Sequence, residues 1–438
     1  MPPQSTAKII SVNRENVRLC ASAARISTTL GDAMQIFSDS ANHASNSALI
    51  DKVLRSGHNS LIEHAVFTLA FSNVSVLVEQ FIIEFRLASY TVKSRRYVDF
   101  SQIGYYTPDG MSDEAKQLYQ SHMDFLFGEY HFFVSSGVPK EDARFVLPYS
   151  FLSNYYCTMN ARELQHVLKE IYGGRGRGIR ELIDLANQIC EQLEELFPCI
   201  LRDIYAVLDE GKNRDESNYE CGRISLAGIS SEPVISSSVV ELAAYSDSTD
   251  NQGIRDFFRT GQGRESAAHN PRLPELIHAT FIVRDISLAG LTHIVRHRMQ
   301  SIIIPPIPVI DPNRFLVPPS IRESKTLLQR YLDVFARNVE RIMMLRGHCF
   351  SNEAYLALSG NTLDVITSMN ARELKLFFRL RCCSRAQWEI RNTAFDMLRK
   401  LRDKEGGFFM KCGPGCFTDG QCPEGPLSCG DHKTTLFD

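Results

Sequence analysis

An internal repeat constrains the fold of this chain more than any other feature of its sequence. The segment 159–164, Met-Asn-Ala-Arg-Glu-Leu, occurs again unchanged at 369–374, an offset of 210 residues. Three shorter pairs keep the same order at offsets of 198 to 214: 24–27 with 222–225, 61–64 with 275–278, and 86–89 with 298–301. Solenoid repeats have periods of roughly 20–50 residues, so a period this long predicts two tandem domains, each with its own core.

Local composition predicts where the two copies meet. The stretch 208–220, reading LDEGKNRDESNYE, has the polar composition of a linker. A second polar stretch, 246–264, reads as a surface insertion in the second copy. We predict a first domain at 1–208, a linker at 209–220, a second domain at 221–408, and a Cys-rich tail at 409–438.

The pattern of apolar residues predicts a mixed fold. Runs of β-branched and apolar residues predict strands over 66–78 and 280–286. Helical periodicity predicts helices over 117–133, 162–168, 182–196, 326–345 and 372–399. The expected fold class is therefore mixed α/β (α+β).

The charge balance and the cysteines narrow the class of protein. Among 438 residues, 48 are Lys or Arg and 51 are Asp or Glu, which argues against a dedicated nucleic-acid or membrane-surface binder. No apolar run reaches the roughly 18 residues of a membrane span, and the first residues do not resemble a signal peptide. Eight of twelve cysteines are scattered, as expected in a reducing compartment. We expect a cytoplasmic protein.

Three cationic clusters are candidates for an anion-binding site. Arg296-His297-Arg298 ends the largely apolar run 286–295, where such a cluster is costly unless an anion pairs with it. The alternative is a solvated end of an element. The second candidate is Ser94-Arg95-Arg96 and the third is the single residue Arg144. A single arginine is more often part of a surface ion pair than a ligand.

These residues together resemble the flavin-dependent thymidylate synthases. Arg296-His297-Arg298-x-x-Ser301 is similar to the start of the family signature RHRxxSxNExSxR, and the segment 86–97 of the first copy is similar to its end. Further family features are found at 56–64, at Asp142-Ala143-Arg144, at Asn370-x-Arg372 followed by Arg381, and at 386–391. The resemblance spans about residues 15 to 400, and the signature is split between the two copies.

The resemblance implies a reaction and an assembly. Members bind FAD and use NADPH and methylenetetrahydrofolate to convert dUMP into dTMP. Their mixed α/β domains form homotetramers with active sites between subunits. This chain would therefore be two tandem thymidylate synthase-like domains forming a pseudo-dimer, and it would pair as a homodimer of pseudo-dimers. The implied partner is dUMP or a related nucleotide, with no nucleic acid and no membrane.

The family motifs survive in this chain as one complete set divided between the copies. The second copy keeps Arg296, His297, Arg298, Asn370, Arg372 and Arg381, and the first keeps Ser94, Arg96, Arg144 and His166. The opposite combination holds Glu84, Phe85, Ile171, Ile304, Pro306, Pro308 and Ala354. Glu84 would repel a phosphate and the apolar residues offer no donor. We expect one composite active site per chain.

The resemblance also implies roles. Nucleotide binding falls to Ser94, Arg95, Arg96, Arg144, His293, Arg296 and Arg381, with Arg381 also catalytic through charge stabilisation at the uracil N3–C4 region. Cofactor binding falls to Ser60, His166, Arg296, His297, Arg298, Asn370 and Arg372. Val92 and His293 depart from the family pattern. Alternatives are therefore a paralogue that alkylates C5 of another pyrimidine nucleotide, or a non-catalytic flavin- or nucleotide-binding regulator.

The last thirty residues carry a separate cluster of cysteines. Cys412, Cys416, Cys422 and Cys429 lie within 18 residues and are followed by His432. Four thiols so close suit a tetrahedral, structural zinc ion. Their spacing matches no standard zinc ribbon, so free thiols or a cluster of another metal are the alternatives.

Overall fold

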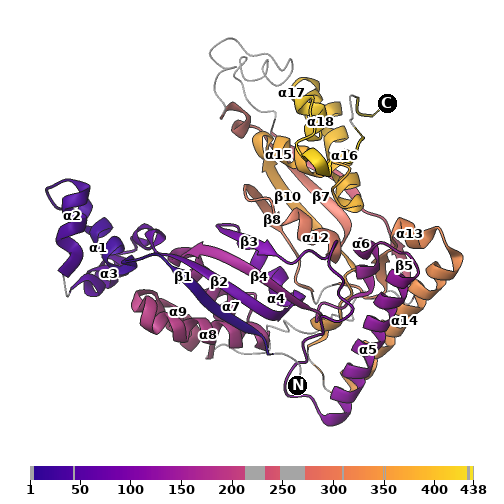
Figure 1. Ribbon diagram of the computed structural model, residues 1–438, viewed down its shortest axis with the longest axis horizontal. Coiled ribbons are helices and arrows are strands. Elements are labelled where there is room, and N and C mark those ends of the chain that lie inside the picture. Colours follow the sequence, from indigo (N-terminus) through magenta and orange to yellow (C-terminus); the bar gives the residue numbers. More distant parts are fainter. Residues whose placement is uncertain are drawn as a thin grey trace. The chain divides into compact units, whose positions relative to one another are not determined.

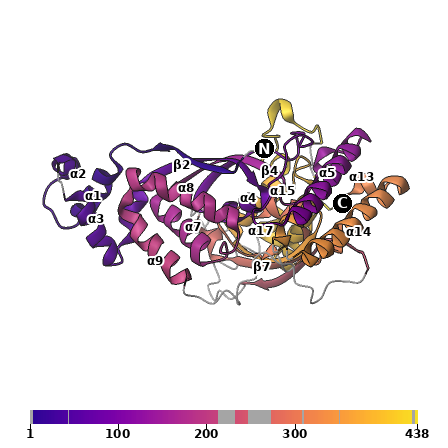
Figure 2. The ribbon, with the colours of Figure 1, turned by 90° about the horizontal axis from the view of Figure 1, so that it is seen from below.

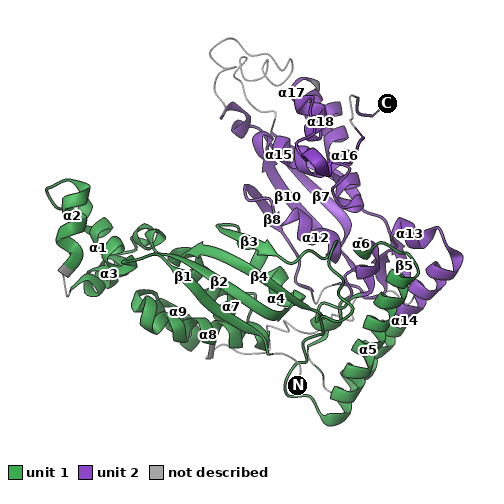
Figure 3. Ribbon diagram, in the orientation of Figure 1, with its two compact units in different colours: residues 1–140, 147–225, 337–357 green, residues 141–146, 226–336, 358–438 purple. Residues whose placement is uncertain are grey.

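Figure 1 shows the computed structural model of the chain, which describes residues 4–42, 45–212, 232–246, 272–307, 310–348, 350, 352–431 and 435–437. The described residues divide into two compact units (Figure 3). Unit 1 comprises residues 1–140, 147–225 and 337–357, and unit 2 comprises 141–146, 226–336 and 358–438. Each unit is therefore built mostly from one copy of the repeat.

Two short segments belong to the unit of the other copy. Residues 141–146 of the first copy are part of unit 2, and residues 337–357 of the second copy are part of unit 1. Backbone hydrogen bonds fix this exchange: Gly360 N donates to Phe145 O in unit 2, and Tyr149 N donates to Ala357 O in unit 1, each over 2.8 Å. The two continuous domains expected from the sequence are thus interwoven at these segments.

Unit 1 is built on an antiparallel sheet of order β1-β2-β4-β3. The strands are β1 (Thr6–Val12), β2 (Val66–Ser75), β3 (Ala88–Val92) and β4 (Leu152–Asn160). Helices α7 (Ala161–Gly173), α8 (Arg180–Leu196) and α9 (Leu201–Lys212) cover one face of it (Figure 2). Alternate residues of β2, including Phe67 and Leu69, are fully buried, as expected for a sheet with one covered face.

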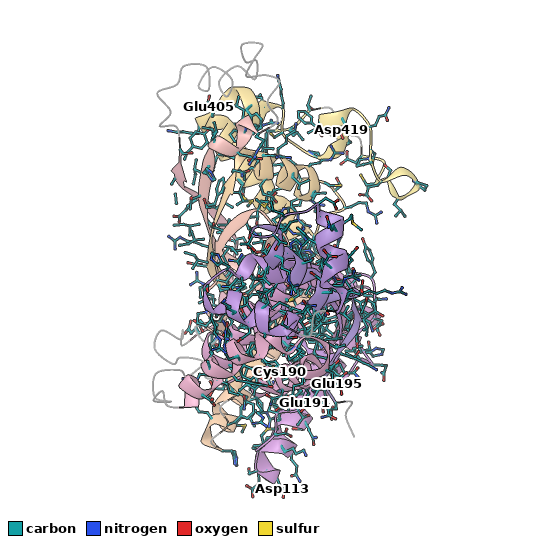
Figure 4. All side chains as sticks on the ribbon, turned by 90° about the vertical axis from the view of Figure 1, so that its left-hand side faces the viewer. Asp113, Cys190, Glu191, Glu195, Glu405 and Asp419 are labelled. Atoms are coloured by element: carbon teal, nitrogen blue, oxygen red, sulfur yellow. The ribbon has the colours of Figure 1, made fainter. Side chains whose placement is uncertain are left out.

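The other helices of unit 1 lie around this sheet. They are α1 (Asn16–Ile26), α2 (Ala33–Asp39), α3 (Asn46–Arg55), α4 (Val76–Ile83) and α5 (Asp113–Ser135), with the 3₁₀ helix η2 (Asn59–His64). Helix α5 begins where Ser112 accepts a hydrogen bond from Ala115 N, and Asp113 lies at that end (Figure 4). An acidic residue there complements the helix dipole.

Unit 2 repeats the topology of unit 1. Its main sheet has the order β6-β7-β10-β8, with β6 (Val239–Tyr245), β7 (His278–Ser287), β8 (Gln300–Ile303) and β10 (Thr362–Asn370), all antiparallel. A parallel pair joins β5 (Val234–Ser236) to β9 (Arg314–Leu316). Its helices are α12 (Leu288–Ile294), α13 (Pro319–Arg322), α15 (Ala371–Arg381), α16 (Trp388–Lys404), α17 (Gly406–Met410) and α18 (Gly415–Asp419).

Helix α14 (Lys325–Gly347) and the short α6 (Lys140–Ala143) each have residues in both units. The predicted mixed fold class is confirmed.

A buried carboxylate recurs at the same place in both units. Glu181 Oε1 accepts hydrogen bonds from Ser75 N and Ser5 Oγ, at 2.8 and 2.7 Å. In unit 2, Glu389 Oε1 accepts from Ser287 N at 2.7 Å. Burial raises the pKa of both carboxyl groups. Each serine ends the second strand of its sheet and caps the helix that follows. The glutamate therefore ties its own helix, α8 in unit 1 or α16 in unit 2, to this strand–helix junction.

Some predicted elements end earlier than the apolar pattern suggests. The strand expected over 66–78 stops at Ser75, because Ser75 caps α4 by accepting from Val78 N. The helix expected over 372–399 is broken between Arg381 and Trp388. Residues 209–212 of the predicted linker form the last turn of α9, and the rest of it lies outside the described residues, as do 247–264 of the predicted insertion. Among the helices of the described part, none has the length and apolar character to cross a bilayer.

Candidate functional site

The Arg-His-Arg element follows α12 in unit 2 and alternates in exposure. Arg296 and Arg298 are exposed, whereas His297 is 4% exposed. The imidazole of His297 packs edge-on against the Phe377 ring, with centroids 4.7 Å apart. The element is therefore anchored by its central residue and presents its two arginines outward.

His297 forms the middle of a three-residue chain of hydrogen bonds. Its Nδ1 lies 2.9 Å from Glu373 Oε1, and Arg381 Nε donates to its Nε2 over 3.0 Å. Because a guanidinium can only donate, Nε2 acts as the acceptor and the proton of the neutral ring belongs on Nδ1, facing Glu373. The structure therefore shows His297 holding Arg381, the predicted catalytic arginine, and the flavin contact expected of His297 stays a prediction.

A cavity of about 560 Å³ lies along α15 in unit 2. Asn370 lines it and caps the helix by accepting from Glu373 N at 2.9 Å. Three cations, Arg372, Lys375 and Arg379, also line it, and their spacing of three and four residues places them on one helical face. The cavity therefore has a row of cations along α15, beside the acidic lining residues Glu275 and Glu373.

Sequence reasoning found Asn370 and Arg372 but missed Lys375 and Arg379. The signal was the spacing of three and four residues between cations, which is the period of one helix face. Two of the three cations already have acidic partners: Arg372 pairs with Glu275 at 2.5 Å and Arg379 with Asp419 at 2.6 Å. Asp419 belongs to α18 in the C-terminal tail (Figure 4), so the tail is tied to α15 beside the cavity.

Arg144 lies in unit 2 although it comes from the first copy of the repeat. Its side chain is buried, its Nε donates to Glu141 O over 3.1 Å, and its Nη2 lies 3.3 Å from His293 Nε2. His293 is on α12, directly before the Arg-His-Arg element. The structure thus brings together two residues, Arg144 and His293, that were both predicted to contact the nucleotide.

Arg95, which was predicted to contact the nucleotide, lies in the core of unit 1. It forms an ion pair with Glu79, and the two side chains are 6% and 0% exposed. Ser153 Oγ also donates to Glu79, and the Arg95 guanidinium lies over the Phe151 ring, 5.4 Å from its centroid. The enclosed guanidinium of Arg95 stabilises unit 1, because without it the buried carboxylate of Glu79 would be uncompensated.

The remaining predicted residues of the first copy lie in unit 1 and are partly or fully exposed. Ser94 Oγ accepts from Arg96 N at 3.4 Å, and the Arg96 guanidinium lies over the Tyr97 ring at 5.4 Å. His166 is exposed, and its hydrogen bond to the Glu163 carboxylate raises its pKa. Ser60 is exposed in η2. Their place in a composite site stays a prediction.

In the first copy, the residue at the position equivalent to Arg296 is an acid that pairs with an arginine of the same copy. Glu84 stands at that position, and Arg175 Nη1 lies 2.7 Å from its Oε2. The Arg175 guanidinium also lies 5.5 Å from the centroid of Phe81, which occupies the position of His293. Burial raises the pKa of Glu84. Ile171 and Ala354 are buried, Ile304 is partly exposed and Pro306 is exposed. Pro308 lies outside the described residues.

The four tail cysteines differ in their surroundings. Cys412 is 1% exposed, with Sγ 3.6 Å from Phe408 O, and burial raises its pKa to about 12. Cys416 and Cys422 are half-buried and Cys429 is exposed. Within the described ranges, no group of three or more His, Cys, Asp or Glu side chains could hold a metal. The four thiols expected to bind zinc are not gathered, and His432 lies outside those ranges.

This arrangement predicts a graded reactivity of the thiols. In the native protein, a thiol reagent is expected to modify Cys429 first, Cys416 and Cys422 more slowly, and Cys412 only after unfolding, because a buried thiol with a raised pKa is scarcely ionised. Mass spectrometry of timed samples would identify each site. A four-thiolate zinc site would instead protect all four until a chelator is added. One zinc per chain by elemental analysis, together with such protection, would contradict the prediction.

Known proteins match both copies of the repeat. A sequence profile described as "Thymidylate synthase complementing protein" matches the chain twice, over residues 8–199 and 215–404. This double match confirms the tandem duplication and the family resemblance.

The individual relatives each match part of the chain. A flavin-dependent thymidylate synthase from Geobacter sulfurreducens is 36% identical over 162 residues, covering 36% of this chain and 68% of the relative. Another from Clostridium tetani is 33% identical over 177 residues, covering 36% and 70%. Among solved structures, a UMP/dUMP methylase, PolB, from Streptomyces cacaoi bound with 5-Br dUMP is 25% identical at a TM-score of 0.40, covering 46% of this chain and 95% of that one.

Proposed function

Since this chain belongs to the thymidylate synthase complementing protein family, we propose that it is a flavin-dependent thymidylate synthase that methylates C5 of dUMP to give dTMP. The carbon donor is methylenetetrahydrofolate and the reductant is NADPH. The observation that carries the proposal is the presence, within unit 2, of the Glu373–His297–Arg381 chain and of Arg144 beside His293. Unit 1 has neither, since Phe85, Ile171, Ala354 and Phe81 stand at the equivalent positions.

The cavity along α15 fits a phosphate-bearing cofactor. Arg372, Lys375 and Arg379 supply three cationic groups on one side, and Asn370 supplies an amide at the helix start. Cationic side chains bind phosphate oxygens through charge-assisted hydrogen bonds. We propose that FAD binds here, with Arg296 and Arg298 as further donors, and that its reduced form supplies the reducing equivalents of the methylation.

The protein residues bind the nucleotide and stabilise charge. The guanidinium of Arg144 is a planar, forked donor that suits the nucleotide phosphate. Arg381, fixed by His297, stabilises the negative charge that develops at the uracil N3–C4 region. A donor held in place before the reaction needs no reorganisation during it, which is why its attachment to a buried histidine matters. Ser94, Arg96 and His166 are proposed to complete this set.

A binding stoichiometry tests the proposal. Because only one set of motifs is intact, each chain is expected to bind one FAD and one dUMP and to form dTMP with methylenetetrahydrofolate and NADPH. Calorimetric titration of FAD-loaded protein with dUMP would give the number of sites per chain, and absorbance would give the bound flavin. Two equivalent nucleotides per chain would contradict the asymmetric arrangement. A colourless protein that takes up no FAD would favour a nucleotide-binding regulator instead.

One observation favours a second substrate candidate. His293 stands where the family commonly has glutamine, and it contacts Arg144 directly. The departure from the family pattern therefore lies beside the proposed phosphate ligand, where it can change which nucleotide is accepted. Product analysis with dUMP, UMP and dCMP in parallel would identify the preferred pyrimidine nucleotide.

A further inference from the structure

One carboxylate of the exchanged segment 141–146 is bound by two other elements of unit 2. Asp142 Oδ1 accepts from Trp388 Nε1 over 2.8 Å, and Asp142 Oδ2 accepts from Ser320 Oγ over 2.6 Å. Trp388 begins α16 and Ser320 lies on α13. Asp142 is 4% exposed, and a carboxylate removed from water in this way would be costly without such partners.

The same segment is also fixed on the other side of Arg144. Gly360 N donates to Phe145 O over 2.8 Å. The Phe145 ring stacks on Trp388, with centroids 6.2 Å apart and an angle of 19° between the planes. Arg144 is therefore flanked by two anchored neighbours, and Trp388 contributes to both anchors, one through its N–H group and one through its ring.

We propose that Asp142 is a positioning residue for the nucleotide site, and that with Trp388 and Ser320 it forms a clasp that sets where the Arg144 guanidinium lies. The inference deepens the proposed function and rests on it. Arg144 has four side-chain torsions between backbone and guanidinium, so a small displacement of its backbone moves the charged group away from His293, now 3.3 Å from it. Even a small misplacement of the guanidinium weakens nucleotide binding, although every residue that contacts the nucleotide is still present.

The second copy of the repeat separates this role from folding. At the equivalent positions it has Asn352 for Asp142 and Ala354 for Arg144. Its segment is held in unit 1 by other groups: Arg346 Nε donates to the buried Glu353 Oε1 over 2.6 Å, Tyr355 OH donates to Glu181 Oε2 over 3.1 Å, and backbone bonds add to these. The exchanged segment can therefore be anchored without this aspartate. The copy that lacks the arginine also lacks the Asp142 carboxylate, as expected if that carboxylate serves the arginine.

The chain contains a built-in reporter of the clasp. Trp388 is the only tryptophan among the 438 residues, and it also lines a cavity of about 430 Å³ with Ser238, Pro319 and Asn392. The tryptophan fluorescence of the protein therefore reports only on the surroundings of Trp388. Removing the Asp142 carboxylate changes the surroundings of the indole N–H group, and the emission maximum is expected to shift.

A double-mutant cycle tests the clasp in the FAD-loaded protein. Calorimetry with dUMP would compare the wild type, Asp142→Ala, Arg144→Ala and the double variant. Asp142→Ala is expected to weaken dUMP binding about five- to tenfold, as for a lost buried hydrogen bond, and to raise KM more than it lowers kcat. The double variant is expected to bind no more weakly than Arg144→Ala, since Asp142 acts only through Arg144.

Conservative and matched variants keep the test independent of folding. Asp142→Asn retains an acceptor for Trp388 and a group that can bond Ser320, so its affinity for dUMP is expected to stay close to that of the wild type. Trp388→Phe loses the N–H donor but keeps a ring beside Phe145, and it provides the same cycle with Arg144→Ala if Asp142→Ala does not fold. Asn352→Ala is the control in the other copy and is expected to leave binding unchanged.

The results that would overturn the proposal differ from those that would overturn the function. Additive losses in the cycle, or Asp142→Ala and Trp388→Phe proteins that bind dUMP like the wild type while Arg144→Ala does not, would show that the clasp does not position Arg144. Wild-type protein that carries FAD but binds no dUMP would overturn the proposed substrate and the positioning role with it.

Discussion

Replacing Arg95 with alanine is expected to destabilise unit 1 by about 3–5 kcal/mol, the usual effect of breaking a buried ion pair from one side. Glu79 is fully buried and Ser153 Oγ is a neutral donor to it, so removing Arg95 leaves a buried carboxylate without its cationic partner. Denaturant unfolding followed by circular dichroism would measure the loss.

The neighbouring residue provides the control. Arg96→Ala removes the same charge from a half-buried side chain, and its effect on unfolding is expected to stay within about 0.5 kcal/mol. Arg96 is the residue proposed to bind nucleotide, so this variant is expected to lose affinity for dUMP and keep its stability. Equal stability losses in the two variants would contradict the distinction drawn between these adjacent arginines.

Replacing Arg144 or Arg381 with alanine is expected to cause the largest losses of ligand binding. Hydrogen bonds to a charged group contribute about 1.5–3 kcal/mol, which corresponds to roughly a 10- to 150-fold weaker binding of dUMP. Arg144 comes from the first copy and Arg381 from the second, yet both are in unit 2. Arg381→Ala also removes the donor to His297 and is expected to lower turnover at saturating dUMP.

The equivalent positions in unit 1 test whether this effect is specific. Ile171 and Ala354 stand where Arg381 and Arg144 would be in a second site, and both are buried in unit 1. Ile171→Val and Ala354→Ser are expected to change stability at most and to leave the binding of dUMP as it is. Binding that survives in Arg144→Ala, or fails in Ile171→Val, would contradict a single site formed from the intact motifs.

The sequence by itself determined the duplication, the mixed fold class and the family. These inferences depend on identical short motifs at a fixed offset and on local apolar periodicity, and both can be read along the chain. Comparison of the copies also showed which motifs remain intact, since each loss is a change of residue type, such as Glu84 for Arg296. The helix predicted over 372–399 placed Arg372 and Arg381 on one element, and α15 carries both.

Only the tertiary structure decided which unit each segment joins and what each charged side chain contacts. Arg95 and Arg96 are adjacent arginines, yet one pairs with buried Glu79 and the other lies beside Tyr97. Asp142 and Trp388 are 246 residues apart and form one hydrogen bond. Sequence patterns encode residue type and local direction, whereas such pairings depend on which distant elements pack together. The exchange of residues 141–146 into unit 2, which brings Arg144 to His293, is set by that packing.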